Sequence, residues 1–343
     1  LAMMAVRLIE LHRVLKPAGS LYLHCDPTAS HYLKILLDAI FDMRNVRNEI
    51  TWKRQSAHSD ARYKFSDVSD IILFYGKSRD AFFVPQYREH NEEYLVKFYR
   101  FDDNDGRGKY RLGDMASPNP RPNMMYDYKE FRCPQKGWRY QRETMKKLDA
   151  EGRIWFPRKP DRTFDTSKRP ALKRYLNEQE GSIVTSVWDD ISPLHSSHSE
   201  RLGYPTQKPL ALLERIISAS SNEGDLVLDP FCGCGTTVHA AQKLSRRWIG
   251  IDVTHLAIHL IQRRLKDAFP GISFDIAGVP KDLDGARALA LQDKYEFQKW
   301  ALAMIDAQPY KGGKKGGDGG VDGFLYIKPD GKKTEKVIVS VKG

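Results

Sequence analysis

The sequence predicts an α/β fold in which helices cover a doubly wound, mostly parallel sheet. Two observations predict this class. Apolar strands alternate with segments of helical periodicity, both before residue 76 and after residue 201. In the later half, an apolar run at residues 226–229 passes directly into a glycine-punctuated turn that opens a helix. The stretch between these halves has a different composition, which indicates an insertion.

Two helices and three strands are expected before residue 76. The first helix is predicted by apolar residues at helical spacing, namely Met4, Leu8, Leu11 and Leu15, and the Lys-Pro-Ala-Gly string at residues 16–19 ends it. Residues 20–25 are expected to form a buried strand, after which Asp26 begins a second helix. Two further strands are expected at residues 48–52 and 70–75.

The elements expected after residue 201 place a turn between two parallel strands. Thr206 is expected to cap a helix whose first turn contains Pro209. The strand at residues 226–229 comes next, a second strand ends near Asp252, and Thr254 is expected to cap the following helix. We expect strands from both sides of the insertion to enter one sheet, so that the insertion interrupts a single domain.

The turn after residue 229 has the features of a nucleoside-binding site. Gly233 and Gly235 let the backbone turn tightly and let a ligand lie against the main chain. Asp252 stands 19 positions after Gly233, a spacing typical of a carboxylate that accepts hydrogen bonds from ribose hydroxyls. A dinucleotide site needs a small residue where this chain has Val238, and a P-loop needs a lysine where it has Gly-Thr-Thr. The pattern favours a nucleoside cofactor without phosphate.

Two strings closely resemble the DNA amino-methyltransferases, which modify the exocyclic amine of adenine or cytosine. The first resembles that family's S-adenosylmethionine loop and comprises Asp229, Pro230, Phe231, Cys232, Gly233, Cys234, Gly235, Thr236 and Thr237. The second resembles the family element that closes over the methionine end of the cofactor, and contains Thr206, Lys208 and Pro209. The resemblance implies a Rossmann-like methyltransferase fold, S-adenosylmethionine as cofactor, these residues with Asp252 as its site, and double-stranded DNA as partner.

The family's catalytic tetrapeptide, Asp/Asn/Ser-Pro-Pro-Tyr/Phe, is absent from the sequence. The Pro-containing strings at residues 26–28, 117–120 and 192–194 do not match it. The cofactor loop follows the insertion, an order that resembles the β class, whose tetrapeptide lies near the N-terminal end. We therefore expect the chain to be a fragment that lacks this segment, holds no catalytic residue for methyl transfer and shows no methylation alone.

Aromatic and basic clusters fill residues 76–201 and are typical of a target-recognition region. Rings can stack on bases while arginines contact phosphates or guanine edges. The candidates for DNA contact are Arg107, Arg111, Trp138, Arg139 and Arg142, together with Lys53 and Arg54 in the polar loop after residue 52. Each cluster taken alone could instead be a half-buried strand with a solvated charged face.

Composition agrees with a DNA partner. The 343 residues carry 55 Lys and Arg against 44 Asp and Glu, which gives a net charge of +11 and a pI near 9.3. A solvated basic surface would give the same balance. Four cysteines without metal-ligand spacing favour a reducing cytoplasm, and no apolar run has the roughly 20 residues of a membrane span.

The tail after residue 285 is expected to form an α+β fragment. A helix near residues 295–302 is followed by a Lys- and Gly-rich loop and two strands. The tail resembles the start of an Mrr-like endonuclease domain of the PD-(D/E)xK kind, with Asp322 and Lys342 matching and Glu296 as a possible further ligand. The resemblance implies Mg²⁺ at Asp322, although Ser340 stands where an acid or glutamine is usual.

The expected organisation is a methyltransferase core at residues 1–75 and 202–285, a recognition insert at 76–201 and a nuclease-like tail at 286–343. Three functions remain open at this point: part of a DNA amino-methyltransferase in a restriction-modification system, a Mg²⁺-dependent endonuclease that reads DNA through this fold, or a non-catalytic DNA-binding module. The choice between adenine and cytosine N4, the target sequence and the oligomeric state are not determined by the sequence.

Overall fold

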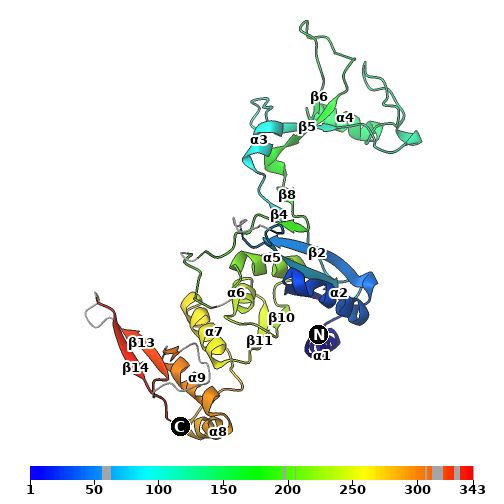
Figure 1. The fold of residues 1–343 in the computed structure, drawn as a ribbon. Helices are drawn as coiled ribbons and strands as arrows, with labels where there is room; N and C mark the ends of the chain where they lie inside the picture. The colour runs from blue at the N-terminus through cyan, green and yellow to red at the C-terminus, as the bar shows by residue number, and fades with distance from the viewer. Residues whose placement is uncertain are drawn as a thin grey trace. The chain divides into compact units, whose positions relative to one another are not determined.

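The computed structural model describes residues 1–55, 63–195, 198–204, 206–305, 307–310, 320–327 and 333–342. These residues form two compact units, one comprising Leu1–Gln86 with Thr185–Gly343 and the other Tyr87–Val184. Figure 1 shows the mixed helices and strands of both. Among the described residues, no helix combines the length and apolar character needed to cross a bilayer.

The N-terminal part of the first unit contains every element expected from the sequence. These elements are α1 (Ala2–Val14), β1 (Ser20–Cys25), α2 (Pro27–Phe41), β2 (Val46–Lys53) and β3 (Ser69–Gly76), with a 3-10 turn η1 (Met43–Asn45) and β9 (Val187–Trp188) from beyond the insertion. As predicted, Asp26 caps α2, because its carboxylate accepts hydrogen bonds from the N–H groups of Thr28 and Ala29 at 2.9 and 3.0 Å.

The sheet of this part has the order β1-β3-β2-β9. Strand β3 runs antiparallel to both β1 and β2, while β2 and β9 are parallel. The prediction of a mostly parallel sheet is therefore wrong here. The cause is the connection between β2 and β3, which contains no helix in its described residues and returns the chain antiparallel, whereas a parallel pair needs a longer crossover.

The core of the N-terminal part lies between this sheet and helices α1 and α2. Leu8, Leu37 and Tyr75 have no exposed surface, and Phe41 and Leu73 are almost as deeply buried. Because each such side chain contributes about 1.5–3 kcal/mol when fully buried, this cluster fixes the helices against the sheet.

The cofactor half contains α5 (Leu210–Ser220), β10 (Leu226–Asp229), α6 (Thr236–Lys243), β11 (Arg247–Gly250) and α7 (His255–Ala268). Strands β10 and β11 are parallel, as predicted, with Asp229 opposite Gly250. They form a sheet of their own among the described strands, so the expected single sheet is divided in two. The halves are nevertheless tied together, since Tyr22 Oη in β1 lies 2.7 Å from Ser220 Oγ at the end of α5.

The start of α5 differs from the prediction. Thr206 has a positive φ of 63° and precedes the helix by four residues, so it is not the N-cap. The N–H of Leu210 instead donates to a carboxylate oxygen of Glu200 at 2.7 Å. By contrast, Thr254 caps α7 as predicted, because its hydroxyl accepts from the N–H of Ala257 at 3.2 Å.

The second unit, Tyr87–Val184, is the insertion. Its elements are β4 (Tyr87–Arg88), α3 (Glu92–Phe98), β5 (Tyr110–Asp114), η2 (Pro122–Met124), α4 (Arg142–Ala150), β6 (Ile154–Trp155), β7 (Ala171–Tyr175), η3 (Leu176–Glu178) and β8 (Ser182–Ile183). It is narrower than the expected 76–201. The N–H of Val84 bonds to Ala219 O, and β9 pairs with β2, so both flanks of the insertion belong to the first unit.

The tail contains α8 (Leu283–Gln292), α9 (Lys294–Met304), β12 (Gln308–Pro309), β13 (Gly323–Ile327) and β14 (Glu335–Val339). The three strands form an antiparallel sheet in the order β12-β13-β14. The predicted helix and two strands are therefore confirmed, while most of the predicted Lys- and Gly-rich loop, residues 311–319, lies outside the described residues.

Candidate cofactor site

The candidate site begins where β10 ends. The carboxylate of Asp229 accepts a hydrogen bond from the N–H of Phe231 at 3.1 Å, which turns the chain away from the strand. Gly233 and Gly235 then have φ values of 50° and 74°, and α6 begins at the next residue, Thr236. A left-handed conformation favours glycine, so the residue types at both positions are explained by the backbone.

Space also requires glycine in this loop. A Cβ on Gly235 would lie 2.6 Å from Ile261 Cγ1 of α7, and one on Gly233 would lie 3.1 Å from Tyr204 Cε1. A third close approach involves Gly250 at the end of β11, where a Cβ would lie 2.8 Å from Val238 Cγ2. Gly250, on the strand, is thus the small residue that lets α6 pack closely against the sheet. Because this space is left by the strand, the helix can have the larger Val238 at the facing position.

Asp252 joins the loop to α7. One carboxylate oxygen accepts from the N–H of Gly233 at 3.0 Å, and the other accepts from both the N–H and the hydroxyl of Thr254 at 2.9 Å. A carboxylate has about four acceptor positions, so capacity remains for a ligand hydroxyl after these three bonds. The predicted ribose acceptor is therefore held in one orientation at the carboxyl end of β11.

The segment around Thr206 lies against the same loop. The Tyr204 ring is the group nearest to a Cβ on Gly233, and Lys208 Nζ donates to Thr206 O at 2.9 Å. Burial, followed by repulsion from Arg54, lowers the pKa of Lys208, although Asp70 acts in the opposite direction. The sequence predicts that Thr206 and Lys208 lie at the cofactor loop, and the segment that contains them contacts this loop through Tyr204. The sequence analysis did not identify Tyr204. Pro205 lies outside the described residues.

A buried polar cluster adjoins Lys208 at the carboxyl end of β1. Asp70 accepts from His24 Nε2 at 2.9 Å and pairs with Arg54 Nε at 2.9 Å. The pKa of His24 is lowered, mainly by burial and then by the charge of Lys208. Arg54, a predicted DNA contact, is thus held by a carboxylate.

The residues of the loop fit an adenosyl cofactor. Two glycines expose backbone, a fixed carboxylate stands at the end of the neighbouring strand, and the loop is followed directly by the first turn of α6. Cys232 and Cys234 are buried, and burial raises the pKa of the Cys232 thiol to about 12, so they fill space without reacting.

Comparison with known proteins agrees with this geometry. The profile described as DNA methylase matches residues 1–263. The chain belongs to the DNA methylase family. It is 32% identical over 266 residues to the type II methyltransferase M.EcaI of Enterobacter cloacae, covering 77% of this chain and 57% of that protein. It is 54% identical over 114 residues to the type II methyltransferase M2.DpnII of Streptococcus pneumoniae, covering 33% and 41%.

Two further matches cover a larger share of the matched protein. The DNA adenine methyltransferase YhdJ of Escherichia coli K12 is 26% identical over 277 residues, covering 80% of this chain and 70% of YhdJ. The protein chain in the crystal structure of the M1.HpyAVI–SAM complex is 17% identical in sequence and matches with a TM-score of 0.41, covering 76% of this chain and 80% of that chain. The chain spans 57%, 38% and 38% of the length of M.EcaI, M.HpaI of Haemophilus parainfluenzae and the StyLTI Mod subunit of Salmonella typhimurium.

In this member of the DNA methylase family, Arg264 of α7 holds the cofactor loop in place through hydrogen bonds. Its side chain is 6% exposed, and its guanidinium donates to Thr236 Oγ1 at 3.0 Å and to Cys234 O at 3.5 Å. It also lies 3.6 Å from the carboxylate of Glu200, the group that caps α5. Burial lowers the pKa of Arg264. The sequence argument missed Arg264, although a charged residue on the apolar stripe of α7 was a usable signal.

Arg264→Met is expected to destabilise the chain by about 1–3 kcal/mol, because it removes these bonds and leaves Glu200 without its buried partner. Affinity for S-adenosylmethionine should fall as well. Arg263→Met is the matched control, since Arg263 is the preceding residue of α7 and is 61% exposed; it should change stability by less than about 0.5 kcal/mol. Urea unfolding and calorimetric titration measure both. Equal effects of the two substitutions would contradict this role of Arg264.

The predicted DNA contacts in the insertion fall into different environments. Trp138 has no exposed surface and its Nε1 donates to Tyr126 O at 2.7 Å, so it is a core residue, and the prediction that its ring contacts DNA is wrong. Arg107 pairs with Asp105 at 2.6 Å and lies over the Tyr175 ring. Arg139 donates to Ala116 O, and Arg142 lies over the Tyr126 ring.

Two other predicted contacts lie near the ends of strands. Lys53 is exposed at the end of β2, while Arg111 lies in β5 and is half-buried. The part of the predicted polar loop at residues 56–60 lies outside the described residues.

The nuclease-like residues of the tail have structural partners. One carboxylate oxygen of Asp322 accepts from the N–H of Val341 at 2.6 Å and the other accepts from Gln298 Nε2. Glu296 pairs with Lys299 at 2.6 Å. In the described part of the chain, no three His, Cys, Asp or Glu residues are grouped to hold a metal ion. The predicted Mg²⁺ site therefore has no support there.

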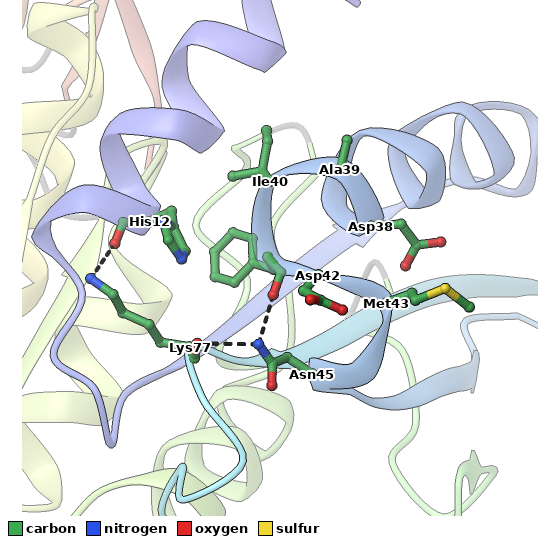
Figure 2. A pocket seen from close by; sticks show the side chains of 9 residues that line it. His12, Asp38, Ala39, Ile40, Asp42, Met43, Asn45 and Lys77 are labelled. Carbon is green, nitrogen blue, oxygen red and sulfur yellow. Dashed lines mark hydrogen bonds between the residues drawn. The ribbon is translucent and has the colours of Figure 1, made fainter.

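A surface cleft on the first unit has no residue of the cofactor loop in its lining (Figure 2). It is near the start of β1 and the end of β3, and is lined by His12, Asp38, Ala39, Ile40, Phe41, Asp42, Met43, Asn45 and Lys77. Lys77 Nζ donates hydrogen bonds to the carbonyl oxygens of His12 at 2.7 Å and Leu15 at 2.6 Å, and so caps the C-terminal end of α1. Asp38 pairs with Lys34. The polar groups of the cleft thus have structural roles.

Proposed function

We propose that the chain is the cofactor-binding and DNA-recognition part of an S-adenosylmethionine-dependent methyltransferase that acts on an exocyclic amine in duplex DNA. The observation that carries this proposal is the glycine loop after β10 with the Asp252 carboxylate fixed beside it. Asp252 would accept from the ribose hydroxyls, and the backbone at Gly233 and Gly235 would lie against the adenosyl group. The cofactor supplies a methyl group activated on a sulfonium, so this chain has only to bind and orient it.

Charge and family support DNA as the substrate. The net charge of +11 favours a polyanion, and the relatives include restriction-modification and adenine methyltransferases by name. Adenine N6 and cytosine N4 both remain within this proposal. A Mg²⁺-dependent nuclease activity of the tail stays a prediction from resemblance, because Asp322 and Glu296 bond to protein groups.

Calorimetric titration of the 343-residue chain with S-adenosylmethionine tests the proposal. We expect saturable binding of one molecule per chain, competition by S-adenosylhomocysteine, and no binding of NAD or ATP, since the loop lacks the third small residue and the lysine that those ligands need. Absence of any heat or competition with a folded chain would refute it. Circular dichroism on the same sample establishes that the chain is folded.

A further inference from the structure

The insertion contains two arginines that face each other without a compensating charge. Strands β5 and β7 are antiparallel, and Arg111 is directly opposite Arg174 in their register. Side chains in such a position are about 4.5–5.5 Å apart at Cβ, and like charges placed there destabilise the strand pair. This arrangement has a cost in the folded chain, so its presence calls for a physical explanation.

The two guanidinium groups also lack hydrogen-bond acceptors. Nε of each arginine is buried and has no hydrogen-bond partner among the described residues, and neither arginine forms an ion pair with a described carboxylate. Since Nε is their only buried unpaired atom, the terminal nitrogens of both groups reach the surface. These exposed terminal nitrogens have no acceptor among the described residues, so they are open to an acceptor from outside the chain.

Three other basic residues of the same unit have the carboxylate partners that these two lack. Arg107 pairs with Asp105, Arg153 with Glu178 and Lys173 with Asp103. Lys173 and Arg174 are adjacent in β7, so their side chains point to opposite faces of the sheet. One face of the strand pair therefore carries neutralised charges, while the other carries a free pair.

The position of Arg174 is accommodated by a glycine on the neighbouring strand. A Cβ on Gly113 of β5 would lie 2.6 Å from Arg174 Nε and 3.2 Å from its Cδ. Gly113, Leu172 and Ile154 share this face by register and bring no carboxylate to it. Lys109 precedes β5, is exposed, and accepts a ladder bond from Leu176, which adds a third positive charge on the same face.

We propose that Arg111 and Arg174 together bind one phosphodiester group of the DNA backbone. The exposed terminal nitrogens of the two guanidinium groups can donate to both anionic oxygens of one phosphate, which turns the repulsion between the arginines into shared attraction. Contacts of this kind fix the position of a protein on the duplex without reading its sequence. This inference rests on the proposed DNA substrate and adds Arg174 to the residues that contact it.

Fluorescence anisotropy of a duplex oligonucleotide with the whole chain tests the pair. Arg111→Gln and Arg174→Gln should each weaken binding about tenfold and lower the slope of log affinity against log salt by about 0.9. The double variant should lose little more than either single variant, since both arginines hold the same phosphate. Gly113→Ala keeps both charges but displaces Arg174, and should weaken binding as well.

The controls separate this inference from the proposed function. Lys146→Gln on α4 makes the same charge change at a 58%-exposed position and should alter affinity by less than twofold. Without DNA, Arg174→Gln should unfold at a higher temperature than the unchanged chain in low salt, because one repelling charge is removed, and the difference should shrink in high salt. Full additivity of the two losses, or an equal loss in Lys146→Gln, would overturn the shared phosphate contact of Arg111 and Arg174 without touching the proposed function. No duplex binding by the unchanged chain would overturn the DNA-directed function itself.

Discussion

Asp252→Ala is expected to weaken binding of S-adenosylmethionine about 100-fold. The carboxylate would accept two charge-assisted hydrogen bonds from the ribose, and losing them corresponds to about 3 kcal/mol. The substitution also leaves the N–H of Gly233 without its acceptor, which loosens the turn on which the cofactor rests. Calorimetric titration measures the loss of affinity, and Asp267→Ala is the charge-matched control on α7, at a position 73% exposed.

A ligand series separates the two roles of Asp252. S-adenosylhomocysteine can be compared with its 2′-deoxy and 3′-deoxy forms in both proteins. If the carboxylate accepts from the ribose, Asp252→Ala should cost less affinity toward the deoxy ligand that lacks the bonded hydroxyl. An equal loss for all three ligands would show that Asp252 acts only on the loop, and unchanged affinity for S-adenosylmethionine would contradict its place in the site.

The sequence predicted those parts of the site that depend on local chemistry. The glycines at 233 and 235 follow from backbone conformation, the cap at Thr254 from a hydroxyl beside a helix start, and the place of Asp252 from the spacing of two parallel strands. Each of these requires information from only a few neighbouring residues, which a sequence displays directly.

The failures concern contacts between distant segments. Glu200 caps α5 from ten residues away, so the hydroxyl of Thr206, the nearer candidate, is not used. Trp138 looked like a stacking residue beside arginines, yet it closes the core of the insertion with Met115 and Met145. A local pattern gives the chemical type of a residue but not whether another segment covers it.

The division of the sheet has the same origin. Strand order depends on which edges meet, and the two halves are separated by the whole insertion. The sequence showed strands on both sides, but the antiparallel β3 between β1 and β2 follows from the way their connection, which has no helix in its described residues, folds back. The sequence analysis missed Arg264 for a related reason. Its side chain, on α7, contacts Thr236 and Glu200, which belong to two other segments, and such contacts are not visible in a local pattern.

Gly235→Ala is expected to destabilise the chain by about 2–4 kcal/mol and to disrupt cofactor binding. Part of this cost, about 1–2 kcal/mol, is that of any Cβ in a left-handed conformation, and the rest is the clash at 2.6 Å with Ile261 Cγ1. Gly224→Ala is a closely matched control, because Gly224 has a φ of 79° and a Cβ there would meet no described atom within 4 Å.

A second-site variant distinguishes the clash from the backbone cost. Ile261→Ala removes Cγ1 and Cγ2, which a Cβ on Gly235 would approach to 2.6 and 3.2 Å, and leaves the Cβ of residue 261 at 3.3 Å, so in the double variant Gly235→Ala should cost little more than Gly224→Ala does alone. Urea unfolding of the unchanged chain, the two single variants and the double variant gives the coupling free energy, which we expect to be at least about 1 kcal/mol in the direction of rescue. Strictly additive losses would mean that Ile261 does not confine the loop, and that the glycine is needed for its conformation alone.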